Sequence, residues 1–145
     1  MLAKRTLSAL ILAPLFVASI WLGYPYFNIL ICVMGAVSVT EVMLITNNQE
    51  GGKASIIAIL VGFISGTSFF SYGNYELSLI SFIFGGIIAI YLSKRNVINI
   101  LWMEFAYLYV VIACVSLIEL RDLSEIGRQA VIWLFAVVRA NDIGA

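Results

Sequence analysis

The sequence predicts an all-α protein, a polytopic transmembrane helix bundle of about six spans with the last one cut short. Hydrophobic residues make up 63% of the chain and charged residues only 11%, whereas a soluble domain is about a quarter charged. The mean hydropathy is correspondingly high, at +1.07. The charges fall in short clusters between long apolar runs. Helices are expected because lipid cannot satisfy exposed backbone groups.

Apolar runs mark the expected spans in chain order. A helix needs about 20 apolar residues to cross the hydrocarbon core, and five runs come close to that length. They cover residues 6–22, 26–46, 54–72, 77–92 and 101–120, and a sixth begins near Gln129 and continues to Ala145. The breaks between them contain Gly, Pro, Asn or charged residues, which are typical of turns. We expect residues 1–145 to form a single transmembrane domain.

Residue content excludes several functional classes. The 145 residues contain no histidine, which excludes Ser-His-Asp and Cys-His catalysis and HExxH metal sites within them. Eight basic residues balance eight acidic ones, so the basic patch that binds nucleic acid is not expected. Cys32 and Cys114 lie inside apolar runs, where we expect them to pack as free thiols.

Loop charges predict the orientation of the spans, because cytoplasmic loops carry an excess of Lys and Arg. With a cytoplasmic N-terminus, five basic residues lie inside: Lys4, Arg5, Lys53, Lys94 and Arg95. Only Arg121 and Arg128 then lie outside. The aromatic residues that flank the first two outer turns agree with a belt at headgroup level. They are Trp21, Tyr24, Tyr26, Tyr72 and Tyr75.

Small residues repeat every four positions in two of the runs. Ala58, Gly62 and Gly66 do so in the third run, and Gly85 and Ala89 do so in the fourth. Small residues at this spacing let helix backbones approach closely. We therefore expect helix packing here, with a substrate crevice beside the glycines as the alternative.

The last run differs from the others because polar residues follow it directly. Nine apolar residues, 130–138, lead into Arg139, Asn141 and Asp142. Nine helical residues cover only about 14 Å, so a straight helix places these groups within the membrane, where a charge costs about 2.5–3.5 kcal/mol. Either Arg139 and Asp142 pair on one helical face, or a polar site forms at the cytoplasmic side. In such a site, Asp142 would bind or organise Mg²⁺.

Three glutamates lie close to the ends of other spans. Glu41 precedes the end of the second run by five residues. It is either a second site carboxylate or a side chain that reaches headgroup level, and the sequence favours neither. Glu104 and Glu119 lie near the ends of the fifth run, where we expect them at the membrane interface.

The C-terminal residues form a recognisable stretch, Val-Ile-Trp-Leu-Phe-Ala-Val-Val at 131–138 followed by Ala-Asn-Asp-Ile-Gly-Ala at 140–145. This stretch resembles a membrane segment of bacterial phosphatidate cytidylyltransferase, the CDP-diacylglycerol synthase family. Lys4-Arg5 before Leu-Ile-Leu-Ala-Pro at 10–14 is similar to the family's basic opening helix. Glu41 lies where that family has a glutamate in its second helix. The resemblance covers the chain loosely and its last fifteen residues well.

The resemblance implies a membrane transferase of phospholipid biosynthesis. Its reaction converts CTP and phosphatidate to CDP-diacylglycerol and pyrophosphate, with Mg²⁺ as cofactor. Site residues carried over are Asp142 and Asn141, with Glu41 as a weaker candidate, and Asp142 is the candidate metal ligand. The implied location is a bacterial inner membrane with a cytoplasmic N-terminus, and a homodimer is left open.

Two departures from the family pattern affect the expected activity. Arg139 stands where the family usually has a large aromatic residue. A lysine-bearing loop and a signature with lysine and paired aspartates are not found in these 145 residues. We therefore expect an N-terminal fragment of a longer family domain that is inactive alone.

Two alternative functions remain at this stage. The first is a related CTP-dependent polyprenol or phytol kinase, which the family's downstream signature would distinguish. The second is a small transporter or packing subunit with an intramembrane pair of Arg139 and Asp142. Inverted repeats or broken helices would favour a transporter, and neither is clear in the sequence.

Overall fold

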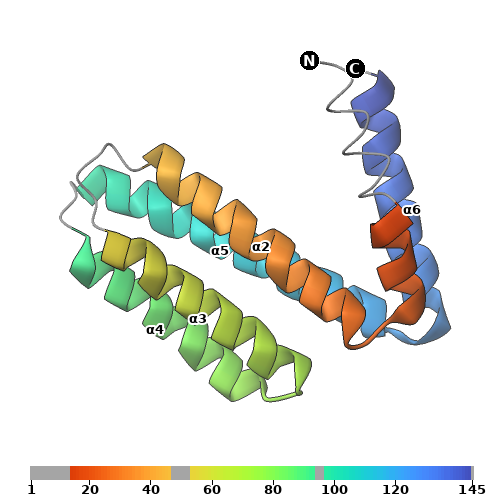
Figure 1. Cartoon of the computed structure of the whole chain (residues 1–145), viewed down its shortest axis with the longest axis horizontal. Helices are drawn as coiled ribbons and strands as arrows, with labels where there is room; N and C mark the ends of the chain where they lie inside the picture. The colour runs from red at the N-terminus through yellow and green to blue at the C-terminus, as the bar shows by residue number, and fades with distance from the viewer. Residues whose placement is uncertain (1–13, 47–52, 94–96, 145) are drawn as a thin grey trace. The chain divides into compact units, whose positions relative to one another are not determined.

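The computed structural model describes residues 14–46, 53–93 and 97–144 (Figure 1). Within these ranges, the side chains of residues 46, 97–98, 124–125, 139 and 142–144 stay outside the description. The described residues form helices joined by short turns, which confirms the predicted all-α class. After a helical segment at 14–22, the helices are α2 (Tyr26–Thr46), α3 (Lys53–Ser71), α4 (Tyr75–Leu92), α5 (Val97–Asp122) and α6 (Ser124–Gly144).

Four of the described helices are long and apolar enough to cross a membrane. These stretches are Tyr26–Ile45, Lys53–Ser71, Tyr75–Leu92 and Asn99–Asp122. They match the second to fifth predicted spans. The first predicted span is described only from residue 14 onward. The sixth has a shorter apolar stretch, Ile126–Val138, because polar residues occupy the rest of α6.

The predicted turns at Gly23 and Gly73 are present. Both glycines have a positive φ, 69° and 77° respectively, a conformation that costs a residue with a Cβ atom. At the second turn, the Gly73 amide donates to the Phe70 carbonyl at 2.9 Å. Each glycine therefore allows the chain to reverse between two helices.

The predicted break at 121–128 is much shorter in the structure. Helix α5 continues to Asp122 and α6 begins at Ser124, so only Leu123 lies between them. The Leu123 amide donates to the Glu119 carbonyl at 3.2 Å, and the Gly127 amide donates to the Leu123 carbonyl at 2.7 Å. Charged residues such as Arg and Glu are good helix formers, which is why this polar segment stays helical.

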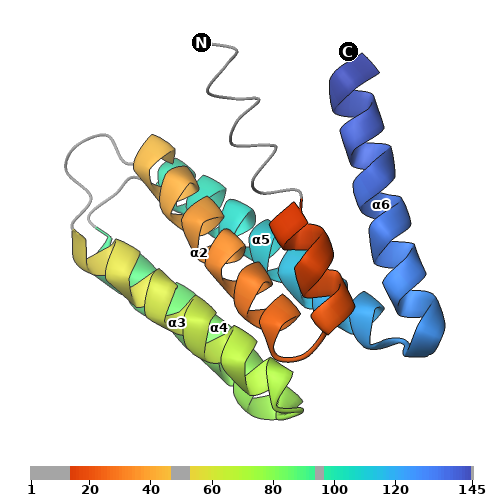
Figure 2. The same ribbon diagram turned by 45° about the vertical axis from the view of Figure 1, so that its right-hand side comes forward.

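The chain divides into two compact units, and each contains residues from distant parts of the sequence. The first unit comprises Met1–Leu30 and Leu117–Ala145, and the second comprises Ile31–Ser116. Helices α2 and α5 each contribute to both. In the second unit, α3 and α4 lie side by side along their length (Figures 1 and 2).

Glycines of α2, α3 and α4 lie at close contacts between the helices of the second unit. A Cβ atom on Gly62 of α3 would lie 2.6 Å from the Gly85 Cα of α4. This contact confirms the predicted packing of small residues. Gly35 of α2 lies against Phe63 of α3 and Cys114 of α5. Small residues therefore mark contacts between three of these helices and their neighbours.

Aromatic and aliphatic side chains join the helices of the first unit. The Phe16 ring stacks on Phe135 of α6, with a centroid distance of 4.7 Å, and is tilted against Phe27 at 6.2 Å. Ile20 and Val131 are fully buried. These contacts pack segment 14–22 against α2 and α6.

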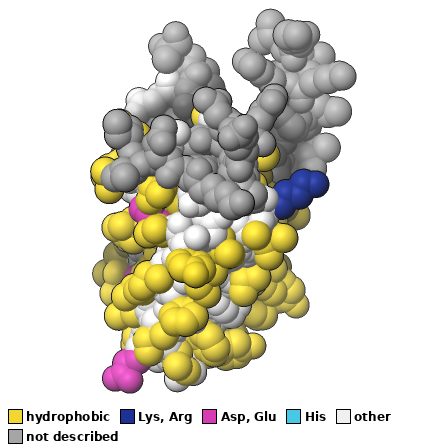
Figure 3. Space-filling view, turned by 90° about the vertical axis from the view of Figure 1, so that its left-hand side faces the viewer, with side chains coloured by type: hydrophobic (Ala, Val, Ile, Leu, Met, Phe, Trp, Pro, Cys, Tyr) yellow, Lys and Arg dark blue, Asp and Glu magenta, His cyan; other side chains and the backbone are white. Residues whose placement is uncertain are grey.

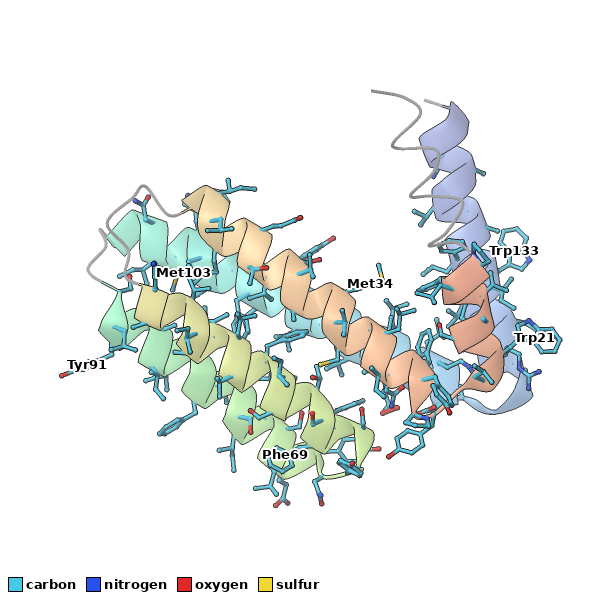
Figure 4. The ribbon with its side chains drawn as sticks, viewed as in Figure 1. Trp21, Met34, Phe69, Tyr91, Met103 and Trp133 are labelled. Atoms are coloured by element: carbon cyan, nitrogen blue, oxygen red, sulfur yellow. The ribbon has the colours of Figure 1, made fainter. Side chains whose placement is uncertain are left out.

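Large apolar side chains are exposed on several helices, as expected for surfaces that face lipid. Hydrophobic side chains cover most of the described part of the face in Figure 3, and few charged ones interrupt them. Tyr91 of α4 points away from its helix (Figure 4). The two cysteines are free thiols, as predicted, and the Cys32 sulfur lies 3.1 Å from the Thr67 hydroxyl oxygen.

Candidate functional site

The predicted C-terminal site lies on the last part of α6. Asn141 is exposed there. Asp142 occupies a helical position, but its side chain and that of Arg139 lie outside the described residues. The two interpretations of Arg139 and Asp142, as a mutual pair or as parts of a polar site, both stay predictions.

Glu41 lies on α2 with an exposed side chain. It belongs to the second unit, whereas Asn141 and Asp142 belong to the first. Successive spans cross the membrane in alternating directions. The second and sixth predicted spans therefore run the same way, and the C-terminal ends of α2 and α6 are predicted to face the same side of the membrane. A joint role for Glu41 and Asp142 therefore stays a prediction.

The described side chains supply no ready-made metal cluster. Among them, no group of three or more His, Cys, Asp or Glu residues could hold an ion. Magnesium in proteins commonly takes only one or two carboxylates and completes its shell with water and substrate phosphates. A site built on Asp142 with few protein ligands is compatible with that chemistry, and it stays a prediction.

Glu104 is a polar group whose surroundings were not anticipated from the sequence, which predicted an interfacial side chain. In the structure, its carboxylate lies against α4, where a Cβ atom on Gly86 would be only 2.8 Å from Oε2. Oε1 is buried and has no hydrogen-bond partner. Ionisable residues inside membrane helices are costly and usually serve a function. Glu104 is therefore a further candidate for polar chemistry within the second unit.

A periodic pattern could have located Glu104 beside the core. Met103, Tyr107 and Val111 are buried at four-residue spacing on α5, which marks the face of the helix turned to its neighbours. Glu104 directly follows the first of them. The Tyr107 hydroxyl donates to the Phe82 carbonyl of α4 at 3.3 Å, so this face of α5 brings polar groups to α4. The glycine pair at 85–86 was a second signal, because it leaves room for a side chain.

A family model supplies the remaining observation. The model of the cytidylyltransferase family matches residues 3–145, nearly the whole chain. The chain belongs to this family. No curated protein and no solved structure matches it.

Membership confirms the resemblance found in the sequence. It makes the chain a member of a group of CTP-using transferases. The apolar helices α2 to α5 give this cytidylyltransferase family member the character of a multi-pass membrane protein. Lipid and nucleotide are the general substrate classes that fit both facts.

Proposed function

We propose that this chain forms the membrane part of a phosphatidate cytidylyltransferase. The observation that carries the proposal is the family match over residues 3–145. The resemblance of residues 131–145 to a membrane segment of phosphatidate cytidylyltransferases supports the specific reaction, because this segment carries the candidate site residues Asn141 and Asp142. Four apolar helices support an acceptor that is itself a membrane lipid.

In the proposed reaction, a phosphate oxygen of phosphatidate attacks the α-phosphorus of CTP. A new P–O bond forms, the bond from the α-phosphorus to its bridging oxygen breaks, and pyrophosphate leaves. The product is CDP-diacylglycerol. Transfer of this kind depends mainly on positioning and on neutralising negative charge.

Asp142 is the residue that we propose for metal binding or organisation of the site. Asn141 would orient a substrate oxygen through its amide, and Glu41 is the weaker candidate. Bound Mg²⁺ would neutralise charge on the triphosphate. We further propose a bacterial inner membrane location with a cytoplasmic N-terminus, which places Asp142 at the side where CTP is available.

The decisive experiment is a cytidylyl transfer assay with labelled CTP, Mg²⁺ and phosphatidate in detergent micelles. It is run on the complete product of the gene that contains this sequence and on the 145-residue chain. We expect CDP-diacylglycerol from the former. Asp142→Asn should lower the rate about 10-fold or more, as is typical when a metal ligand or its support is lost. Asp122→Asn removes the same group from an exposed position and should leave the rate unchanged.

Other acceptors test the specificity. Transfer to a polyprenol or phytol instead of phosphatidate would replace this proposal with the kinase reaction. Equal loss of activity in Asp122→Asn and Asp142→Asn would contradict a specific role for Asp142. The expectation that the 145 residues are inactive alone stays a prediction, and product formation by that chain would overturn it.

A further inference from the structure

Two arginines in the first unit contact the same end of segment 14–22. The Arg121 Nε atom donates to the Ile20 carbonyl at 2.9 Å. Its Nη2 atom lies 2.8 Å from the position that a Cβ on Gly23 would occupy. The guanidinium carbon of Arg128 lies 5.4 Å from the Trp21 ring centroid, as a cation–π contact. Both cations therefore border residues 20–23.

These arginines use few of their hydrogen-bond donors on the residues that the structure describes. Each guanidinium carries five N–H donors. Among the described residues, Arg121 donates to the Ile20 carbonyl, and the Arg128 Nε atom is buried without an acceptor. The exposed carboxylates of Glu119 and Asp122 form no ion pair with either guanidinium in this part of the chain. Both side chains are half-buried, and a guanidinium with donors left unpaired in such a position is unfavourable. The remaining donors of the two groups are therefore suited to an external anion.

Their position along the helices places them at headgroup level. Arg121 is the penultimate residue of the span Asn99–Asp122. Trp21 is 65% exposed and points outward at the end of its segment (Figure 4). Tryptophan prefers the membrane–water interface, where lipid phosphates lie. The anion most available to both arginines is therefore a lipid phosphate.

We propose that Arg121, Arg128 and Trp21 bind the phosphate of an anionic phospholipid headgroup. A guanidinium presents paired donors that match two phosphate oxygens, and the indole ring packs against Arg128 while its apolar body faces the lipid. Basic groups between membrane helices are a recognised means of binding anionic headgroups.

This site is separate from the proposed transferase site. Arg128 and Asp142 lie on the same helix α6, about 21 Å apart along its axis at about 1.5 Å per residue. The bound lipid needs only a phosphodiester, so phosphatidylglycerol is a suitable probe. It lacks the phosphomonoester that the proposed reaction uses, and the two proposals can therefore fail independently.

The test is a lipid titration of the purified 145-residue chain in an uncharged detergent, followed by native mass spectrometry. Phosphatidylglycerol should bind more tightly than phosphatidylcholine. Arg128→Gln should weaken phosphatidylglycerol binding about fivefold, the equivalent of about 1 kcal/mol for one basic residue near an anionic surface. Lys53→Gln removes one positive charge from an exposed position in the second unit and should have no such effect.

Arg128→Gln is the primary variant because Arg121 also holds the Ile20 carbonyl and its loss is expected to weaken the fold. Thermal unfolding of each variant without lipid shows whether a loss of binding is a loss of folding. Equal binding of the two lipids, or equal weakening by Arg128→Gln and Lys53→Gln, would overturn the proposal. Equally tight binding of inorganic phosphate would show that the site does not require a lipid and would overturn the proposed ligand.

Discussion

A Cβ atom added to the glycines at the helix contacts of the second unit would meet different kinds of neighbouring atoms. A Cβ atom added to Gly62 would meet the Gly85 Cα at 2.6 Å, and backbone cannot move aside without separating α3 from α4. A Cβ atom added to Gly86 would meet the end of the Glu104 side chain at 2.8 Å, which can rotate away. The same substitution therefore has different consequences at the two positions.

We expect Gly62→Ala to lower the free energy of unfolding by about 1–3 kcal/mol, the typical result of overpacking. Gly86→Ala should change it by less than about 1 kcal/mol, because alanine also gains about 0.5–1 kcal/mol over glycine in a helix. Denaturation in mixed micelles, followed by circular dichroism, measures both. Equal destabilisation would mean that the Glu104 carboxylate is held in place as firmly as the backbone.

Helix α6 depends on tertiary contacts more than the helices of the second unit do. Its apolar stretch, Ile126–Val138, is shorter than a full span, and its last turns carry polar residues. The stacked pair of Phe16 and Phe135 joins it to segment 14–22. Ring stacking is a directional contact that an aliphatic side chain cannot replace.

Phe135→Leu should therefore lower the free energy of unfolding by about 0.5–1.5 kcal/mol, because it removes the stacking while it keeps an apolar side chain. Trp133→Leu on the same helix is the matched control, since Trp133 is 71% exposed; its effect should stay within about 0.5 kcal/mol. The same micelle denaturation measures both variants. A larger effect at Trp133 would assign the docking of α6 to its other face.

At the scale of the whole molecule, the sequence predicts that basic residues gather at the cytoplasmic ends of the spans. Helix α3 begins at Lys53, and the turn at Gly73-Asn74 follows its other end. Nineteen helical residues cover about 28 Å, nearly the hydrocarbon thickness. The predicted orientation places residue 53 inside and residue 74 outside.

Single-cysteine labelling tests this orientation, after Cys32 and Cys114 have been replaced by alanine. Asn74→Cys should react with a membrane-impermeant maleimide added to intact spheroplasts, and Ala54→Cys should react only in inverted vesicles. Both positions are exposed, and the Asn74 side chain makes no cap hydrogen bond. The opposite labelling pattern would reverse the topology and place Asp142 on the side away from CTP.

The candidate site at the end of α6 stays a prediction that rests on neighbouring residues in the sequence. The polar residues Arg139, Asn141 and Asp142 are conspicuous because they follow an apolar run directly. Glu104 was predicted at the membrane interface, and its contact with α4 was missed because it depends on Gly86, which lies in a different helix. Arg121 and Arg128 were predicted only as loop charges, and their contacts with Ile20 and Trp21 join segments about 100 residues apart.

By itself, the sequence determined the class of the protein, four of its spans and the turns at Gly23 and Gly73. These features depend on local apolar length and on backbone freedom, which neighbouring residues express directly. Only the tertiary structure decided that Gly62 meets Gly85 and that Glu104 lies against Gly86. Such contacts depend on which helix faces join, and that choice is made by packing across distant parts of the chain.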